Sequence, residues 1–172
     1  MTENETRVSG WPPHRVTGVD VWPYRLRDGA AEFLLLHRSG RDGPPFWQGV
    51  SGWIEADEMP HAAALRELRE ETGFEAEALF SVDAIFDLYK WRRGTVETTV
   101  PFAALIAAGA DPRLSDEHDD WRWASLAEAL NLLPYEPQRA ALRRISEDLL
   151  ERPGAAHLYR IDPASERPEK TR

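Results

Sequence analysis

Runs of apolar and β-branched residues alternate with Gly-, Pro- and Asp-rich breaks along most of this chain. These runs predict strands at residues 15–27, 32–38, 46–54, 79–91, 95–106 and 120–124. We expect the first strand to break near Pro23 and the fifth to carry Pro101 at a sheet edge or a bulge, because proline cannot donate to a sheet ladder. Residues 92–94 predict a hairpin between the fourth strand and the fifth.

Three segments carry the start and stop signals of helices. The first runs from Pro60 to Gly73, because proline suits the first turn and glycine suits the left-handed residue that ends a helix. Ser125 predicts the start of a second helix, with Glu128 as its capping-box partner. A third helix is expected over residues 136–151.

The first helix carries a group of acids. Glu67, Glu70 and Glu71 are spaced at i, i+3 and i+4, so their side chains share one face. Their repulsion would cost an isolated helix on the order of a few tenths of a kcal/mol per pair, and a divalent cation would reverse the sign of that cost. Hard oxygen ligands suit Mg²⁺ or Mn²⁺, which also hold phosphate oxygens. The spacing therefore predicts a metal site.

The same stretch, GWIEADEMPHAAALRELREETGF, resembles the sequence signature of the Nudix hydrolases. The pattern G-x5-E-x7-R-E-hydrophobic-x-E-E-x-G-hydrophobic is filled at every fixed position, by Gly52, Glu58, Arg66, Glu67, Leu68, Glu70, Glu71, Gly73 and Phe74. The resemblance implies an α/β/α sandwich with a mixed sheet, a catalytic helix after a loop, and C-terminal helices. It also implies metal-dependent cleavage of a diphosphate linkage. A run of Arg and Glu is usually a solvated, ion-paired helix face, but that alternative gives no reason for the register of Gly52 and Glu58.

The resemblance also implies roles for the residues of the signature. Glu67, Glu70 and Glu71 are expected to bind Mg²⁺ or Mn²⁺, and Glu70 to be catalytic as well. Arg66 is expected to orient the glutamates, and Glu58 to be a further metal or water partner in catalysis. As an acid near a helix N-terminus, Glu58 is equally well explained by the helix dipole.

A general base is expected downstream, because glutamates already bound to metal are poorer bases. Glu117, in the loop sequence SDEHDDWRW, is the candidate for both general base and metal ligand, since Nudix enzymes often carry a glutamate at such a place. Asp116, His118 and Asp119 are nearby competitors. His118 is better explained as a hydrogen-bonded loop residue, because phosphate–metal chemistry needs no imidazole.

Two segments, residues 46–58 and 116–145, are similar to bacterial Nudix enzymes that act on dihydroneopterin triphosphate and related nucleoside triphosphates. This similarity implies a small phosphorylated substrate, a nucleotide-like triphosphate. The alternatives are an RNA-end or dinucleoside polyphosphate hydrolase and a non-catalytic module that senses a nucleotide; the lack of basic surface counts more against RNA than against the dinucleotide. A sensor usually lacks some of the glutamates of the signature, and all of them are present here.

The same similarity implies a substrate site. Arg38 is expected to contact phosphate, Ser51 and Gly52 to lie beside the substrate, and Trp47 or Gln48 to support the pocket. Arg38 is equally well explained as an ordinary charge at the end of a strand, and Trp47 is better explained by core packing. Ser51 and Asp57 stand where many members have glycine, and aspartate adopts a positive φ less readily than glycine does.

Composition and charge limit the class of protein. The chain has 172 residues, of which 42% are hydrophobic, and it has no cysteine, which fits one domain and excludes disulfides and thiolate zinc sites. A net charge of −9 opposes binding to duplex nucleic acid. If the ligand is a polyphosphate, bound cations must make the electrostatic potential at its binding site positive. The polar start is no signal peptide and no apolar run is long enough to span a membrane, so we expect a cytoplasmic protein.

The domain boundaries follow from composition. We expect a flexible N-terminus over residues 1–13, a Nudix domain over 14–152, and a Pro-, Arg- and Glu-rich tail over 153–172 that is partly disordered. Nudix proteins frequently dimerise, so a homodimer is a further expectation from the resemblance.

Overall fold

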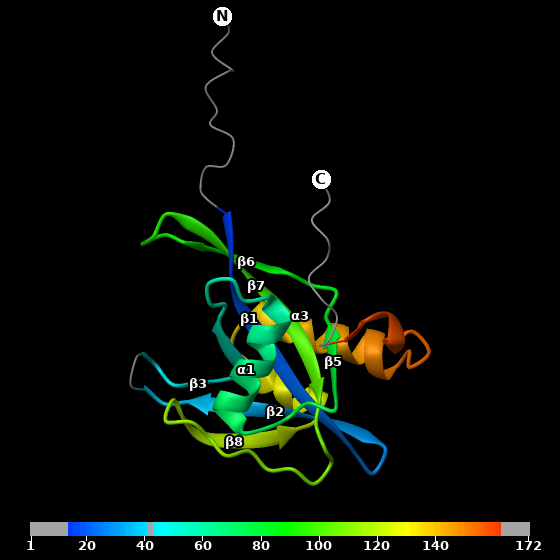
Figure 1. The fold of residues 1–172 in the computed structure, drawn as a ribbon. Helices are drawn as coiled ribbons and strands as arrows, with labels where there is room; N and C mark the ends of the chain where they lie inside the picture. The colour runs from blue at the N-terminus through cyan, green and yellow to red at the C-terminus, as the bar shows by residue number, and fades with distance from the viewer. Residues whose placement is uncertain (1–13, 41–42, 163–172) are drawn as a thin grey trace, which may run out of the picture.

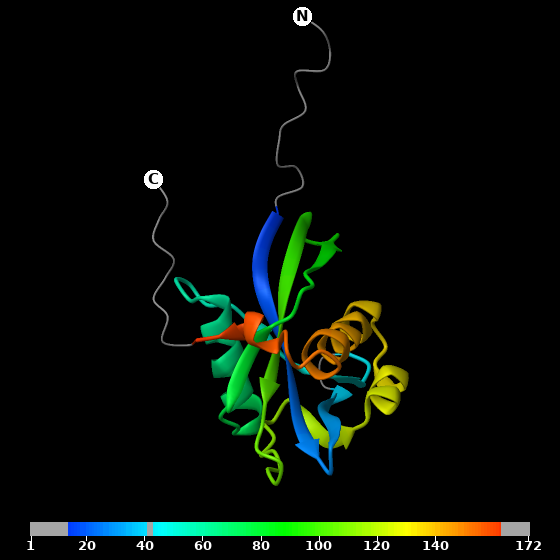
Figure 2. The same cartoon turned by 90° about the vertical axis from the view of Figure 1, so that its right-hand side faces the viewer.

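The computed structural model describes residues 14–40 and 43–162, so the predictions for residues 1–13 and 163–172 lie outside the described residues. Its strands form one mixed nine-stranded sheet, in which β1 and β7 are parallel (Figure 1). Helix α1 covers one face of this sheet, and α2 and α3 cover the other (Figure 2). The predicted α/β/α arrangement with a mixed sheet is confirmed.

The elements have the following bounds in chain order. The strands are β1 (His14–Arg27), β2 (Ala30–Arg38), β3 (Phe46–Gln48), β4 (Val50–Trp53), β5 (Ala78–Ser81), β6 (Phe86–Lys90), β7 (Thr95–Leu105), β8 (His118–Ala124) and β9 (Arg160–Ile161). The helices are α1 (Pro60–Thr72), α2 (Leu126–Leu132) and α3 (Glu136–Ile145), which continues into the π-helical turn η2 (Ser146–Leu150), and a short 3₁₀ turn, η3 (Ala156–Leu158).

Strand β1 lies at the centre of the sheet and contributes to both hydrophobic layers. Val19 and Val21 pack in the layer that contains Leu68 of α1, whereas Trp22 and Tyr24 pack in the layer under α2 and α3. All five side chains are buried. Burying an apolar side chain of this size contributes about 1.5–3 kcal/mol, so β1 holds the two helical layers on opposite faces of one sheet.

Two prolines lie inside continuous strands, so the predicted break at Pro23 and the predicted edge position of Pro101 are wrong. The irregularity of β1 is instead a bulge between Val16 and Gly18. Pro23 follows the residues that pair with β4 and precedes those that pair with β2. Pro101 likewise separates the parts of β7 that pair with β6 and with β5. A missing N–H is tolerated where the neighbouring strand changes.

The single strand predicted over residues 79–91 is also wrong. Strands β5 and β6 replace it, and residues 82–85 separate them. The two strands pair with different parts of β7, so the chain must bend between them. Part of the predicted tail is ordered, since β9 pairs with β5. The proposed domain boundaries stay a prediction.

The ends of the helices agree with the sequence. Pro60 is the first residue of α1, and Gly73 ends it with φ 72° while its N–H donates to the carbonyl of Arg69 (2.8 Å). Ser125 and Glu128 form the predicted capping box of α2. No helix in the described part of the chain is long and apolar enough to span a membrane.

Candidate active site

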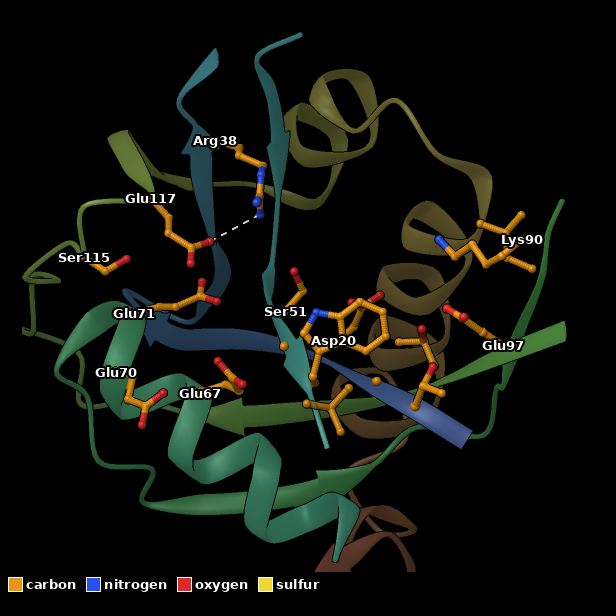
Figure 3. A pocket seen from close by; sticks show the side chains of 17 residues that line it. Asp20, Arg38, Ser51, Glu67, Glu70, Glu71, Lys90, Glu97, Ser115 and Glu117 are labelled. Carbon is orange, nitrogen blue, oxygen red and sulfur yellow. Dashed lines mark ion pairs between the residues drawn. The ribbon is translucent and has the colours of Figure 1, made fainter. Parts of the chain in front are cut away.

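A cavity of about 660 Å³ opens beside α1 (Figure 3). Strands β1, β2, β4, β6 and β7, helix α1 and the loop before β8 contribute its walls. Figure 3 shows four glutamates at one end of the cavity, and Lys90 and Glu97 at the other end. The polar side chains that line it are Thr17, Asp20, Arg38, Ser51, Glu67, Glu70, Glu71, Lys90, Glu97, Thr99, Ser115 and Glu117.

The three glutamates of α1 line the same end of the cavity, as their spacing predicted. Their environments differ, because the side chains of Glu67 and Glu71 are 13% and 7% exposed whereas that of Glu70 is 59% exposed. Burial raises the pKa of Glu67 above its ordinary value, although the hydrogen bond from Arg66 opposes this shift. The helix therefore presents one solvated carboxylate and two sheltered carboxyl groups.

Arg66 joins the signature residues into one network. Its Nε and Nη2 donate to both carboxylate oxygens of Glu58 (3.0 and 2.9 Å), and Nη2 also donates to the carbonyl of Trp53 (2.9 Å). Its Nη1 donates to Glu67 (2.8 Å) and Glu70 (3.2 Å). The hydrogen bonds between Arg66 and Glu58 raise the pKa of Arg66 and lower that of Glu58. Glu58 does not line the cavity, so its contact with the site runs through Arg66.

Gly52 provides the space that Glu67 occupies. A Cβ at residue 52 would lie 1.9 Å from the Cδ of Glu67, a distance that no side chain can adopt. Gly52 pairs with Val19 of β1, so neighbouring backbone holds it in place. Gly52 lines the cavity as predicted, and it also lets the α1 carboxylate lie directly against β4.

Glu71 is the most unusual titratable group in the site. Burial raises its pKa to about 9, and the nearby charges of Glu67 and Glu117 add to the shift, while a backbone hydrogen bond from Ser51 opposes it. Its Oε2 atom has no hydrogen-bond partner among the described residues, and the Nε2 atom of His118 lies 3.7 Å away. A buried carboxylate oxygen without a donor is costly, and a cation at this end of the cavity would remove that cost.

The loop before β8 brings Glu117 to the cavity. Backbone N–H groups of Arg113 and Ser115 donate to carbonyls at the end of α1 (2.9 and 3.3 Å), which fixes the loop across the helix. Glu117 then points into the cavity from the side opposite α1 (Figure 3), and its Oε2 lies 3.4 Å from Nη1 of Arg38. The structure thus brings the predicted general base and the predicted phosphate ligand together.

The competitors of Glu117 do not line the cavity. His118 is buried, its Nε2 is 3.2 Å from Nε2 of Gln48, and burial lowers its pKa. Asp119 lies 2.6 Å from Nδ1 of His37, on an exposed part of the sheet. The hydrogen-bonded role expected for His118 agrees with this geometry.

The predicted substrate residues separate into two groups. Arg38, Ser51 and Gly52 line the cavity, whereas Trp47 does not. Trp47 packs against the hydrophobic layer under α2 and α3, with its ring 5.0 Å from that of His37, so a contact with substrate is not supported. Asp57 has the positive φ, 62°, expected where an aspartate replaces glycine.

Several residues of the cavity were not predicted. Asp20, Lys90, Glu97, Thr99 and Ser115 all line it. One signal was present for Asp20, since it is the single charged residue in the largely apolar run VTGVDVWPY. The residues from β6 and β7 had no such signal, because only the pairing of β7 with β1, and of β6 with β7, brings them to the cavity.

The donors at the glutamate end suit a divalent cation. They are all carboxylate oxygens, one of them a buried oxygen without a partner. As the side chains stand, the described residues contain no group of three acids or histidines close enough to hold a metal ion. Two of the acids, Glu67 and Glu70, instead share Nη1 of Arg66. Metal binding would therefore bring these carboxylates closer to one another than they lie in this structure.

The family model of the NUDIX domain matches residues 14–149, which is most of the chain. The chain belongs to the Nudix family. The family recognised in residues 52–74 is thus confirmed over residues 14–149, and the chain is a Nudix hydrolase. Members of this family generally use divalent metal ions.

Three curated relatives are named as three different enzymes. A mouse asymmetrical bis(5'-nucleosyl)-tetraphosphatase is 32% identical over 131 residues, which cover 75% of this Nudix chain and 88% of the relative. A Haemophilus influenzae dihydroneopterin triphosphate diphosphatase is 31% identical over 123 residues (64% and 76%). A Myxococcus xanthus octanoyltransferase is 34% identical over 145 residues, and there the chain spans 38% of the relative's length.

Solved structures agree with the fold. The chain is similar to an Ap4A hydrolase from Caenorhabditis elegans, seen in a binary complex, with a TM-score of 0.65 and 28% identity. The match covers 78% of this chain and 97% of that one. The arrangement of strands and helices is therefore that of a Nudix domain.

Proposed function

We propose that this Nudix hydrolase cleaves a diphosphate linkage in a nucleotide-like triphosphate, either a nucleoside triphosphate or dihydroneopterin triphosphate. One observation carries the proposal: Glu67, Glu70, Glu71 and Glu117 line one end of a cavity of about 660 Å³, with Arg38 beside them. Cavities of this volume hold ligands of nucleotide size. The cluster of acids would repel a triphosphate unless cations lay between them.

The cofactor proposed is Mg²⁺, with Mn²⁺ as its substitute, held by Glu67, Glu70 and Glu71, which leaves Glu117 free to act as the base. When bound, it supplies neutralisation of phosphate charge and lowers the pKa of a coordinated water. The all-oxygen donor set favours these hard cations over softer metals.

Residues of the chain bind the phosphate, position the glutamates and accept the proton. Arg38 binds a phosphate oxygen of the substrate, and Arg66 holds the glutamates in place through the hydrogen bonds that it already makes. Glu117, which is 61% exposed at the cavity wall, accepts a proton from the attacking water. The water oxygen forms a new bond to phosphorus, and the bond from phosphorus to the bridging oxygen breaks, so the leaving phosphate group carries away the electron pair.

A dinucleoside polyphosphate is the second candidate substrate. The similarity to the mouse tetraphosphatase and to the Caenorhabditis elegans Ap4A hydrolase favours it. The cavity also extends from the glutamates to Lys90, which offers a second positive charge to a longer phosphate chain. A purely sensing role has less support, because every glutamate of the signature is present.

A substrate screen tests the proposal. The purified full chain is incubated with Mg²⁺ or Mn²⁺ and a panel of nucleoside triphosphates, dihydroneopterin triphosphate, dinucleoside polyphosphates and nucleotide sugars, and the release of pyrophosphate and phosphate is measured. Rapid pyrophosphate release from a triphosphate, lost in Glu70→Gln, supports the proposal. Turnover of dinucleoside polyphosphates alone would select the second candidate, and no turnover by the folded protein would favour the sensor.

A further inference from the structure

Asp20 is a carboxyl group in the cavity that no part of the proposed chemistry uses. It lies in β1, where it pairs with Ser51 of β4 and Pro101 of β7, and it lines the cavity between the glutamates and Lys90 (Figure 3). Burial raises its pKa to about 7, with no hydrogen bond or charged neighbour contributing to the shift. No ion pair or side-chain hydrogen bond joins Asp20 to another residue of the described ranges 14–40 and 43–162.

Asp20 is only partly buried, and it lines the cavity, so a donor on a ligand can reach it. A carboxyl group that has no partner within the protein is usually hydrogen-bonded to a ligand or to water. The chemistry of hydrolysis is placed at the glutamate end, where Arg38 and Glu117 lie. Asp20 belongs to the wall that continues from there toward the hairpin of β6 and β7.

The surroundings of Asp20 suit a planar heterocycle. Trp53 and Leu88 line the same cavity, and they are 57% and 58% exposed, so an aromatic face and an aliphatic surface remain open to a ligand. Arg93 lies 5.4 Å from the centre of the Trp53 ring and helps to hold the indole in place. Cavities that bind nucleotides combine such apolar walls with a few polar groups that determine specificity.

We propose that Asp20 is a specificity residue that accepts a hydrogen bond from an amino group on the base of the substrate, while the base packs between Trp53 and Leu88. This inference rests on the proposed function, since it places the phosphates at the glutamates and the base beyond them. One oxygen of a carboxyl group accepts in either protonation state. Against the ionised carboxylate, a base with a carbonyl in place of the amino group would bring two acceptors together and would bind less well. A protonated carboxyl group could donate to that carbonyl, so base selection is measured at about pH 8.5, where Asp20 is ionised. Adenine, guanine and the pterin ring all carry an amino group.

Matched substrates test the role of Asp20. Hypoxanthine has a carbonyl where adenine has its amino group, and it lacks the amino group of guanine. The wild-type enzyme is therefore assayed with ATP, GTP and ITP. We expect a preference of about 10- to 100-fold in kcat/KM for at least one of the amino bases over ITP, expressed mainly in KM. Asp20→Ala should abolish the preference, and Asp20→Asn, whose carbonyl still accepts, should retain part of it.

Two further measurements separate this inference from the proposed function. Asp83→Asn, which changes an exposed aspartate outside this cavity, is the matched control and should keep the wild-type preference. Calorimetry with methylene-bridged analogues of ATP, GTP and ITP measures base selection without turnover. If no triphosphate is hydrolysed but Asp20→Ala removes a binding preference, the function fails and the subsite stands. Equal binding of all three analogues by the wild type, or a preference that survives in Asp20→Ala, would overturn the assignment of Asp20.

Discussion

Replacing Glu71 by glutamine should stabilise the metal-free protein and abolish its activity. Burial and the charges of Glu67 and Glu117 raise the pKa of Glu71 from 4.5 to about 9, so the folded protein holds a proton that the unfolded chain releases. Its stability therefore falls as the pH rises from about 4.5 toward 9. At pH 8 the cost has an upper limit of roughly 5 kcal/mol, at 1.36 kcal/mol for each pH unit. Glutamine has the shape of the neutral acid and carries no such cost.

The assay compares unfolding of the wild type, Glu71→Gln and Glu70→Gln by urea in the presence of a chelator, at pH 5 and pH 8. Glu70 is the matched control because its side chain is 59% exposed and lies 3.2 Å from Arg66. We expect Glu71→Gln to gain at least about 1 kcal/mol at pH 8, or about 2–4 °C in Tm, and much less at pH 5. Turnover should fall by several orders of magnitude in both variants. An equal gain at the two pH values, or no gain at pH 8, would refute the argument from a buried neutral carboxyl group.

Three other substitutions test the geometry of the site. Gly52→Ala should displace the Glu67 carboxylate, which occupies the space that the new methyl group would need, and should weaken Mg²⁺ binding in calorimetry; unchanged affinity would contradict the packing argument. Arg66→Lys should lose the two-pronged contact with Glu58 and lower Tm by several degrees, because one ammonium cannot replace a guanidinium there; an unchanged Tm would mean that the network contributes little. Glu117→Gln should lower kcat with little effect on Tm, since the side chain is 61% exposed, and wild-type kcat would show that another group accepts the proton.

Helix α1 was predictable because its determinants are local. Proline at the first position, glycine at the left-handed end and three acids at i, i+3 and i+4 all act within a few residues of each other. The difference between Glu70 and Glu71 was not predictable. It depends on the loop of residues 113–117, whose backbone closes over the end of α1 and shelters one glutamate while the other stays in solvent.

The errors in the sheet have a common physical source. Proline was expected to end or border a strand, yet Pro23 and Pro101 lie where the neighbouring strand changes. The pattern of a single segment predicts that it forms a strand, but it does not predict which strands pair with it. The same limit explains Asp20: its place in an apolar run was visible, but its exposure to a cavity follows only from the pairing of β1 with β4 and β7.

The geometry gives the polar positions of the Nudix signature and its first glycine a physical reason. Gly52 leaves room for Glu67, Arg66 holds that carboxylate beside Glu70, and Glu58 holds Arg66 from the other side. Without a cation this arrangement is electrostatically unfavourable. The acids repel one another, and burial further disfavours their charged forms. A sequence selected for stability alone would replace the buried glutamate with a neutral residue. Its presence is explained if a cation offsets the cost during function. The pH-dependent stability of the metal-free protein therefore measures the cost of ionising Glu71 that a cation would have to offset.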